Sequence, residues 1–118
     1  MLDISFYTDA EEPAERIEVA EAFLEWLARS KFSQIGKDCS TRVIIDEEEI
    51  IIPLVELKKS TRSQFVDFFN ETIVEETKKV LDRLDSLSPS VESVYRLRKL
   101  IELLDCFKNE SYQYLQRI

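Results

Sequence analysis

The chain has 118 residues, of which 44% are hydrophobic and 34% are charged, and its formal net charge is −8. It contains no histidine, one glycine and two cysteines. The lack of histidine excludes Ser-His and Cys-His nucleophiles and histidine-based metal sites, and a single glycine excludes a glycine-rich phosphate loop.

These numbers predict one domain, residues 1–118, with enough apolar side chains to form a core. The chain begins without a secretory pattern, and its longest apolar run, Ile50 to Val55, is far too short to span a membrane. Cys39 and Cys106 lack CxxC spacing, so we expect free thiols in a cytoplasmic protein, with a disulfide as the alternative. Cys106 is expected on the polar side of its helix.

The first half of the chain predicts a strand followed by an amphipathic helix. Leu2, Ile4 and Phe6 alternate with polar residues, which is typical of a half-buried strand. A capping pattern at Thr8 and Pro13 predicts a helix from residue 10 or 13 to residue 30. On a helical wheel, one face of this helix holds Ile17, Ala20, Phe23, Leu24 and Leu27, and the opposite face holds Glu11, Glu15, Glu18 and Glu25.

The second half predicts a β-hairpin and two long helices. The β-branched runs 42–45 and 50–55 favour two strands, with Pro53 at an edge, a bulge or the end of pairing. One helix is expected from Ser60 or Thr61 to about residue 87, and another from the Ser88-Pro89 cap to residue 118, as an antiparallel helical hairpin. The predicted class is α+β, with a small sheet packed by three helices in the order β-α-β-β-α-α.

The negative charge lies almost entirely in the first half of the chain. Residues 1–57 carry 14 acidic and 5 basic side chains, whereas residues 58–118 carry 10 acidic and 11 basic ones. An anionic domain repels nucleic acid, because phosphate contacts need lysine and arginine. The asymmetry therefore indicates a surface that binds a basic protein.

Two acidic groups are candidates for that surface. The first is the glutamate face of the predicted first helix, with Glu15, Glu18 and Glu25; it is otherwise a solvated helix face whose early acids favour the helix dipole. The second is the hairpin tip, Asp46-Glu47-Glu48-Glu49, where tight turns normally need glycine. The alternative for the tip is a longer loop that keeps the hairpin soluble and blocks edge pairing.

Two aromatic side chains lie off the predicted core stripes. Trp26 falls where the apolar and acidic faces of its helix meet, and Phe68 falls beside Glu71, Glu75 and Asp82. Such residues are typical of apolar anchors with a charged rim, or of packing at the margin of a core.

Asp46, Glu56 and Lys58 resemble the D…(D/E)-x-K pattern of the PD-(D/E)xK nuclease superfamily. The resemblance covers residues 42–58 and lacks the proline before the aspartate. It implies a metal ion held by the carboxylates and a lysine that polarises the attacking water.

The leading hypothesis is a non-enzymatic acidic protein, with no cofactor and no metal, that masks a basic partner. Bacterial immunity proteins and DNA mimics share this character. The role that we favour is therefore an immunity or antitoxin-type inhibitor, and the partner class is a basic nuclease toxin or another nucleic-acid-binding protein. The predicted contacts are the two acidic groups together with Trp26 and Phe68, in a protein that is a monomer or weak homodimer. The alternatives are the metal-dependent nuclease and a dimerisation module that pairs the long helices across a two-fold axis.

Overall fold

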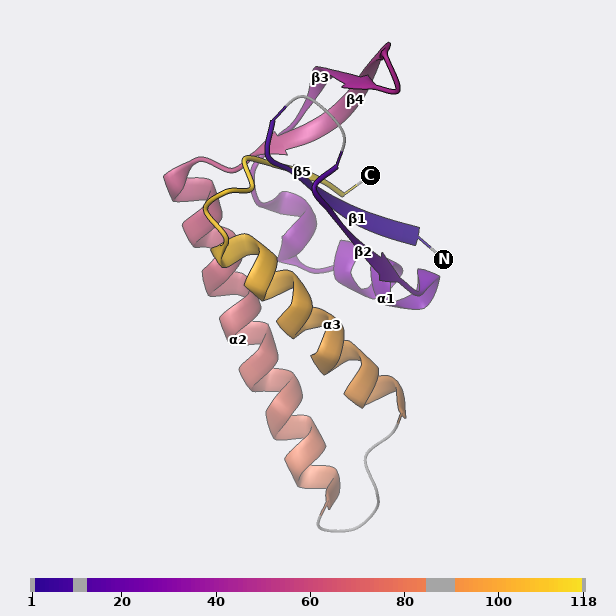
Figure 1. The fold of residues 1–118 in the computed structure, drawn as a ribbon. Helices are drawn as coiled ribbons and strands as arrows, with labels where there is room; N and C mark the ends of the chain where they lie inside the picture. The colour runs from indigo at the N-terminus through magenta and orange to yellow at the C-terminus, as the bar shows by residue number, and fades with distance from the viewer. Residues whose placement is uncertain (1, 10–12, 85–90, 118) are drawn as a thin grey trace.

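A computed structural model describes residues 2–9, 13–84 and 91–117 of the chain. In chain order its elements are β1 (Leu2–Tyr7), β2 (Glu15–Val19), α1 (Glu21–Ala28), the 3-10 helix η1 (Lys31–Gln34), β3 (Asp38–Ile45), β4 (Glu48–Glu56), α2 (Lys59–Leu84), α3 (Val91–Lys108) and β5 (Tyr114–Gln116). The strands form one antiparallel sheet in the order β2-β1-β5-β4-β3 (Figure 1). The α+β class is confirmed, but the predicted order of elements is wrong in two places.

The first error concerns residues 15–19, which form strand β2 rather than the start of a long helix. Ile4 of β1 pairs with Ile17, and Leu2 pairs with Val19. Ile17 and Val19 are buried, whereas Arg16 and Glu18 are exposed, which is the two-residue period of a strand. A short apolar run fits both the helical period of 3.6 residues and the strand period of two. These residues form a strand because β1 offers an edge with which they can pair. The helix is therefore α1 alone, and Glu11 lies outside the described residues.

The second error concerns residues 114–116, which form strand β5 rather than the end of the last helix. Arg62 donates hydrogen bonds to the carbonyl oxygens of Phe107, Asn109 and Tyr112 and so binds the chain where it leaves α3. Leu115 then pairs with both β1 and β4 and is fully buried.

The main core lies between one face of the sheet and the helices. Its fully buried members come from every layer: Ile4, Phe6, Val19, Leu27, Phe65, Phe69, Leu100, Leu103, Phe107 and Leu115. Phe107 stacks on Phe65 and Phe69 with ring centroids 4.5 and 5.2 Å apart. A smaller cluster of Tyr7, Val43 and Leu54 packs beside β5 and the base of the hairpin.

The predicted β-hairpin is confirmed, and its turn is tighter than the loop considered above. Ile45 pairs with Glu48, so Asp46 and Glu47 alone make the turn, and both have positive φ, at 52° and 65°. A two-residue turn with this geometry matches the right-handed twist of the strands and normally takes glycine or asparagine. Glu48 and Glu49 belong to β4. Pro53 lies just beyond the segment that pairs with β5, which agrees with its predicted place at an edge.

The two long helices form the predicted antiparallel hairpin, which Figure 1 shows running away from the sheet at the end opposite to β3 and β4. The expected Ser88-Pro89 cap, the apolar position 87 and residue 118 lie outside what is described of the chain, as does the side chain at position 84. The Cα radius of gyration, 15.5 Å, exceeds the roughly 13.5 Å expected of a compact chain of this length. The molecule is elongated because both hairpins project.

Cys39 and Cys106 are both free, but only Cys39 is exposed. The predicted exposure of Cys106 is wrong, because the sheet covers that side of α3. Burial and then the carboxylates of Glu15, Asp105 and Glu102 raise the pKa of the Cys106 thiol to about 11. The thiol is therefore protonated at neutral pH and unreactive.

We expect Arg62→Ala to lower the free energy of unfolding by about 2–4 kcal/mol, because three carbonyl oxygens lose a charged donor at once. Urea denaturation measures this. Arg62→Lys keeps the charge but not the forked geometry and is expected to recover only part of the loss. A change below about 0.5 kcal/mol in both variants would show that the turn into β5 forms without this arginine.

Candidate functional site

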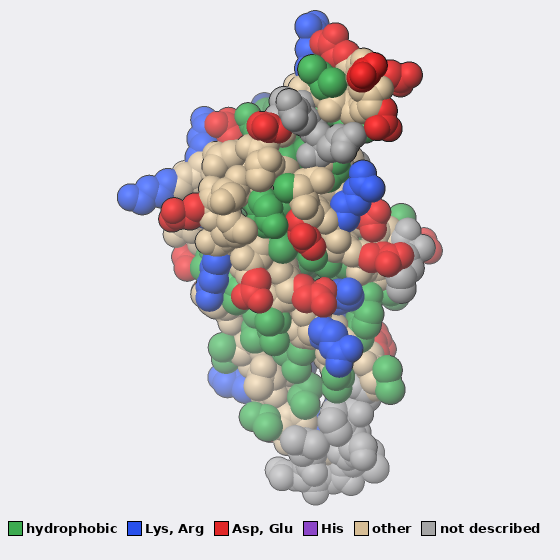
Figure 2. Space-filling view, in the orientation of Figure 1, with side chains coloured by type: hydrophobic (Ala, Val, Ile, Leu, Met, Phe, Trp, Pro, Cys, Tyr) green, Lys and Arg blue, Asp and Glu red, His purple; other side chains and the backbone are tan. Residues whose placement is uncertain are grey.

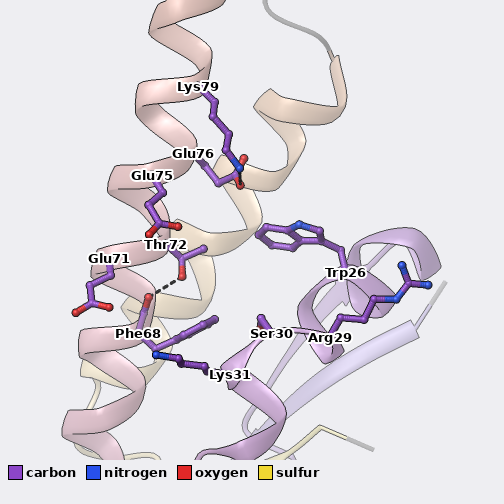
Figure 3. Close-up of a pocket in the computed structure, with 10 residues that line it drawn as sticks. All are labelled: Trp26, Arg29, Ser30, Lys31, Phe68, Glu71, Thr72, Glu75, Glu76 and Lys79. Atoms are coloured by element: carbon purple, nitrogen blue, oxygen red, sulfur yellow. Dashed lines mark hydrogen bonds and ion pairs between the residues drawn. The ribbon is translucent and has the colours of Figure 1, made fainter.

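Most of the predicted partner-binding residues lie on two surfaces. The first is a groove between α1–η1 and α2, with a volume of about 470 Å³ (Figure 3). It is lined by Trp26, Arg29, Ser30, Lys31, Phe68, Glu71, Thr72, Glu75, Glu76 and Lys79, and is called here the α1–α2 groove. The second is the projecting part of the β-hairpin, residues 41–52, called here the hairpin arm.

Trp26 reaches the groove from α1. Its indole packs against Phe23, with ring centroids 5.8 Å apart, and it borders the main core while staying half-buried. The guanidinium of Arg96, from α3, lies 4.7 Å from the centre of the indole. The ring is therefore held in place from two sides and already takes part in one cation–π contact.

Phe68 reaches the same groove from α2. Its ring contacts Phe69 at 5.2 Å and Phe32 of η1 at 6.4 Å, and it also borders the main core. The sequence predicted two separate aromatic anchors at the margin of the core. The fold brings Trp26 and Phe68 to one cavity, although they are 42 positions apart in the chain.

One wall of the groove is a single face of α2. Residues 68, 71, 72, 75, 76 and 79 follow the three- and four-residue spacing of neighbours on a helix. Glu71 and Glu75 are exposed, whereas the side chain of Glu76 is only 5% exposed. Its Oε1 accepts a hydrogen bond from Lys79 Nζ at 3.3 Å. Figure 3 shows the Glu76 carboxylate on the side of α2 that faces the Trp26 indole.

The opposite wall carries the exposed cations Arg29 and Lys31. Between them, Ser30 is the N-cap of η1 and accepts a hydrogen bond from the Phe32 backbone N–H at 3.3 Å. The formal charges around the groove balance, but their environments differ. The side chain of Glu76 is buried, whereas those of Arg29, Lys31 and Lys79 are exposed.

Sequence reasoning missed Glu76, although the sequence carries a signal for it. The residue lies three positions after Ile73 and four before Val80, where the apolar stripe of α2 calls for a hydrophobic side chain. A carboxylate at such a position costs free energy unless it is paired. Among the described residues, Glu76 has one hydrogen bond, from a lysine that is itself 66% exposed.

The predicted acidic helix face does not exist as one surface. Glu15 and Glu18 belong to β2, and because they are three positions apart on a strand, their side chains point to opposite faces of the sheet. Glu25 is exposed on α1. The sheet order also places β2 and β3 at opposite edges, so these glutamates are separated from the hairpin tip.

The tip residues Asp46, Glu47, Glu48 and Glu49 are all exposed at the end of the hairpin arm, where Figure 2 shows acidic side chains gathered. Below them, Ile44 and Ile51 are 56% and 64% exposed. Both lie on the same face of the arm, beside an ion pair of 3.3 Å between Arg42 and Glu49. Residues 48–54 of β4 pair with β3 alone, so the arm extends beyond the rest of the sheet.

The geometry does not support the nuclease pattern. Asp46 precedes β4 and Glu56 ends it, so about 30 Å of extended strand separates the two carboxylates. Glu56 and Lys58 form an exposed ion pair of 3.9 Å instead. Within residues 2–9, 13–84 and 91–117, no three His, Cys, Asp or Glu side chains are grouped so that they could hold a metal ion.

No protein-family model, curated protein or solved structure matches this chain. Of the helices that the structure describes, none is long and apolar enough to cross a membrane.

We expect Glu76→Leu to leave the free energy of unfolding unchanged or to raise it by about 1 kcal/mol, because an apolar side chain suits this position better than a weakly paired carboxylate. Denaturant unfolding measures the effect. Glu71→Leu, at an exposed position of the same wall, is the matched control and is expected to change stability by less than about 0.5 kcal/mol. A loss of more than about 2 kcal/mol in Glu76→Leu would assign Glu76 a structural role instead.

Proposed function

We propose that this protein is a non-enzymatic binding protein that docks its hairpin arm on a basic surface of another protein. The observation that supports this most directly is the composition of the arm. Four exposed carboxylates surround its end, and two exposed isoleucines, Ile44 and Ile51, lie on one face. An apolar patch rimmed by charge is the usual anatomy of a protein-binding surface.

The turn adds a second line of support. Glu47 has a φ of 65°, a conformation that a residue with a long side chain adopts at a cost in free energy. Glycine at this position would remove the strain. Glutamate at this position keeps a negative charge at the tip of the arm but makes the turn less stable than glycine would. Residues that are unfavourable for the local structure are expected at functional sites.

The charge of the whole chain favours the same class of partner. A net charge of −8, with all of its excess in the first 57 residues, attracts a cationic protein and raises its rate of association. Nucleases present basic clefts to their substrates. An inhibitor or immunity protein of a nuclease toxin is therefore the specific role that we propose for the arm.

Charge reversal at the tip tests this proposal. Tagged wild-type protein and the Glu47→Lys/Glu48→Lys variant are used to capture proteins from lysate of the source organism at low and moderate salt. We expect a basic protein that the wild type retains and the variant loses, with an association rate that falls by about tenfold or more. The melting temperature is expected to stay nearly unchanged, because both side chains are exposed.

Asp67→Lys/Asp82→Lys is the matched control, since it makes the same change in net charge at exposed positions on α2. Equal loss of the captured protein in both variants would show that binding depends on the net charge of the protein and not on the arm. Retention by the tip variant would contradict docking through the arm. Inhibition of nuclease activity in the captured protein, by wild type but not by the tip variant, tests the more specific role.

A specific observation also favours the dimerisation module. α2 exposes Val74 and Leu81, and α3 exposes Val94 and Ile101, each pair being seven residues apart. Seven residues are two helical turns, so each pair forms a stripe on its helix. Figure 2 shows hydrophobic side chains over these two helices.

The two stripes lie at the same level along the helical hairpin. A hydrogen bond of 3.3 Å between Arg83 and Ser93 sets the antiparallel alignment, which brings Leu81 level with Val94 and Val74 level with Ile101. Two equal rows of apolar side chains match those of a second copy across a two-fold axis. We propose a four-helix interface between two chains as this second candidate function.

Sedimentation equilibrium tests the dimer. Wild-type protein is expected to approach twice the 13.9 kDa mass of one chain as its concentration rises, and Leu81→Glu/Val94→Glu is expected to stay at the monomer mass. Ile51→Glu, at an exposed position on the arm, is the control and should leave self-association intact. Monomeric wild-type protein at all concentrations would exclude this module.

A further inference from the structure

We infer that the α1–α2 groove is a cation site that takes the guanidinium group of an arginine side chain from the partner protein. The identity of that partner rests on the proposed function. The chemistry of the groove rests on its own residues and can be tested without the partner.

The size and walls of the groove fit an arginine side chain. Its volume of about 470 Å³ lies in the usual range for ligand sites. Trp26 and Phe68 line it from separate elements, so an apolar stem can pack between two aromatic rings. The guanidinium of Arg96, 4.7 Å from the centre of the Trp26 ring, is evidence within this protein that the indole accepts such a group.

The buried charge decides the sign of the ligand. Glu76 is 5% exposed and is fixed on α2, so water screens its charge poorly. Arg29, Lys31 and Lys79 are exposed on flexible side chains, and water and salt screen their charges well. A cation that enters the groove therefore meets a fixed carboxylate, whereas the neighbouring cations can turn away into solvent.

Lys79 is paired with the Glu76 carboxylate in the free protein. A single hydrogen bond of 3.3 Å joins its ammonium to Glu76, and its side chain is 66% exposed. An arriving guanidinium can replace this one contact with two parallel hydrogen bonds to the carboxylate. Glu71 and Glu75, on the same face of α2, add negative charge at the rim.

Trp26 is the only tryptophan of the chain, so its fluorescence reports on the groove directly. We titrate the protein with N-acetyl-L-arginine methylamide and, in parallel, with the isosteric but neutral citrulline derivative. The arginine probe is expected to change the emission saturably with a Kd on the order of millimolar. The citrulline probe is expected to bind at least about tenfold more weakly, because it lacks the charge that Glu76 recognises.

Two variants assign the effect to the groove. Glu76→Gln keeps the shape of the side chain and is expected to weaken the arginine probe about tenfold, with its denaturation midpoint measured to confirm folding. Glu47→Gln, at the tip of the arm, is the control and should leave the Kd unchanged. Equal response to both probes, or an unchanged Kd in Glu76→Gln, would overturn the cation site.

The result is separable from that of the arm. A groove that binds the arginine probe while the tip variant still captures its partner would uphold the cation site and contradict docking through the arm. A groove without response, beside an arm that captures a basic protein, would overturn this inference alone.

Discussion

The fold depends on a three-residue strand. β5 is the only element that joins β1 to β4, and without it the described sheet would be two separate hairpins. Leu115 of β5 is fully buried beside both neighbours. An arginine binds the chain at each end: Arg62 at the turn before β5, and Arg117, whose side chain is 4% exposed, through the carbonyl oxygens of Phe32 and Ile35 and the carboxylate of Asp38.

The joined sheet leaves two hairpins projecting from opposite ends of the molecule (Figure 1). The hairpin arm carries four carboxylates at its tip, whereas the helical hairpin belongs to the half of the chain in which acidic and basic side chains nearly balance. Charge repulsion between two copies is therefore concentrated away from the long helices. The α1–α2 groove lies between these ends and holds the buried carboxylate of Glu76, which places a fixed negative charge next to aromatic rings.

The β-hairpin and the two long helices could be predicted from the sequence because their signals are local. β-branched runs separated by a few acidic residues favour paired strands, and long three- and four-residue periodicity predicts helices wherever the rest of the chain lies. β2 and β5 could not be predicted in this way. The spacing of apolar residues in 15–19 fits both a strand and a helix. The apolar stripe of α3 continues in the sequence through residue 115, although the helix itself ends at Lys108. The conformation of β2 depends on the open edge of β1, and that of β5 depends on the edges of β1 and β4, both of which are distant from β5 in sequence.

The candidate site, like the fold, has features that depend on neighbouring residues and features that depend on packing. The class of the fold, the acidic tip and the two aromatic residues at the margins of their helices can be predicted from the sequence alone. Composition and helical position are properties of neighbouring residues. Three features emerge from the fold: Trp26 and Phe68 share one groove, Glu76 is buried beside them, and Glu15 and Glu18 face opposite ways. Convergence of distant elements and burial arise from packing, and the spacing of residues along one segment carries no information about which other segment covers it.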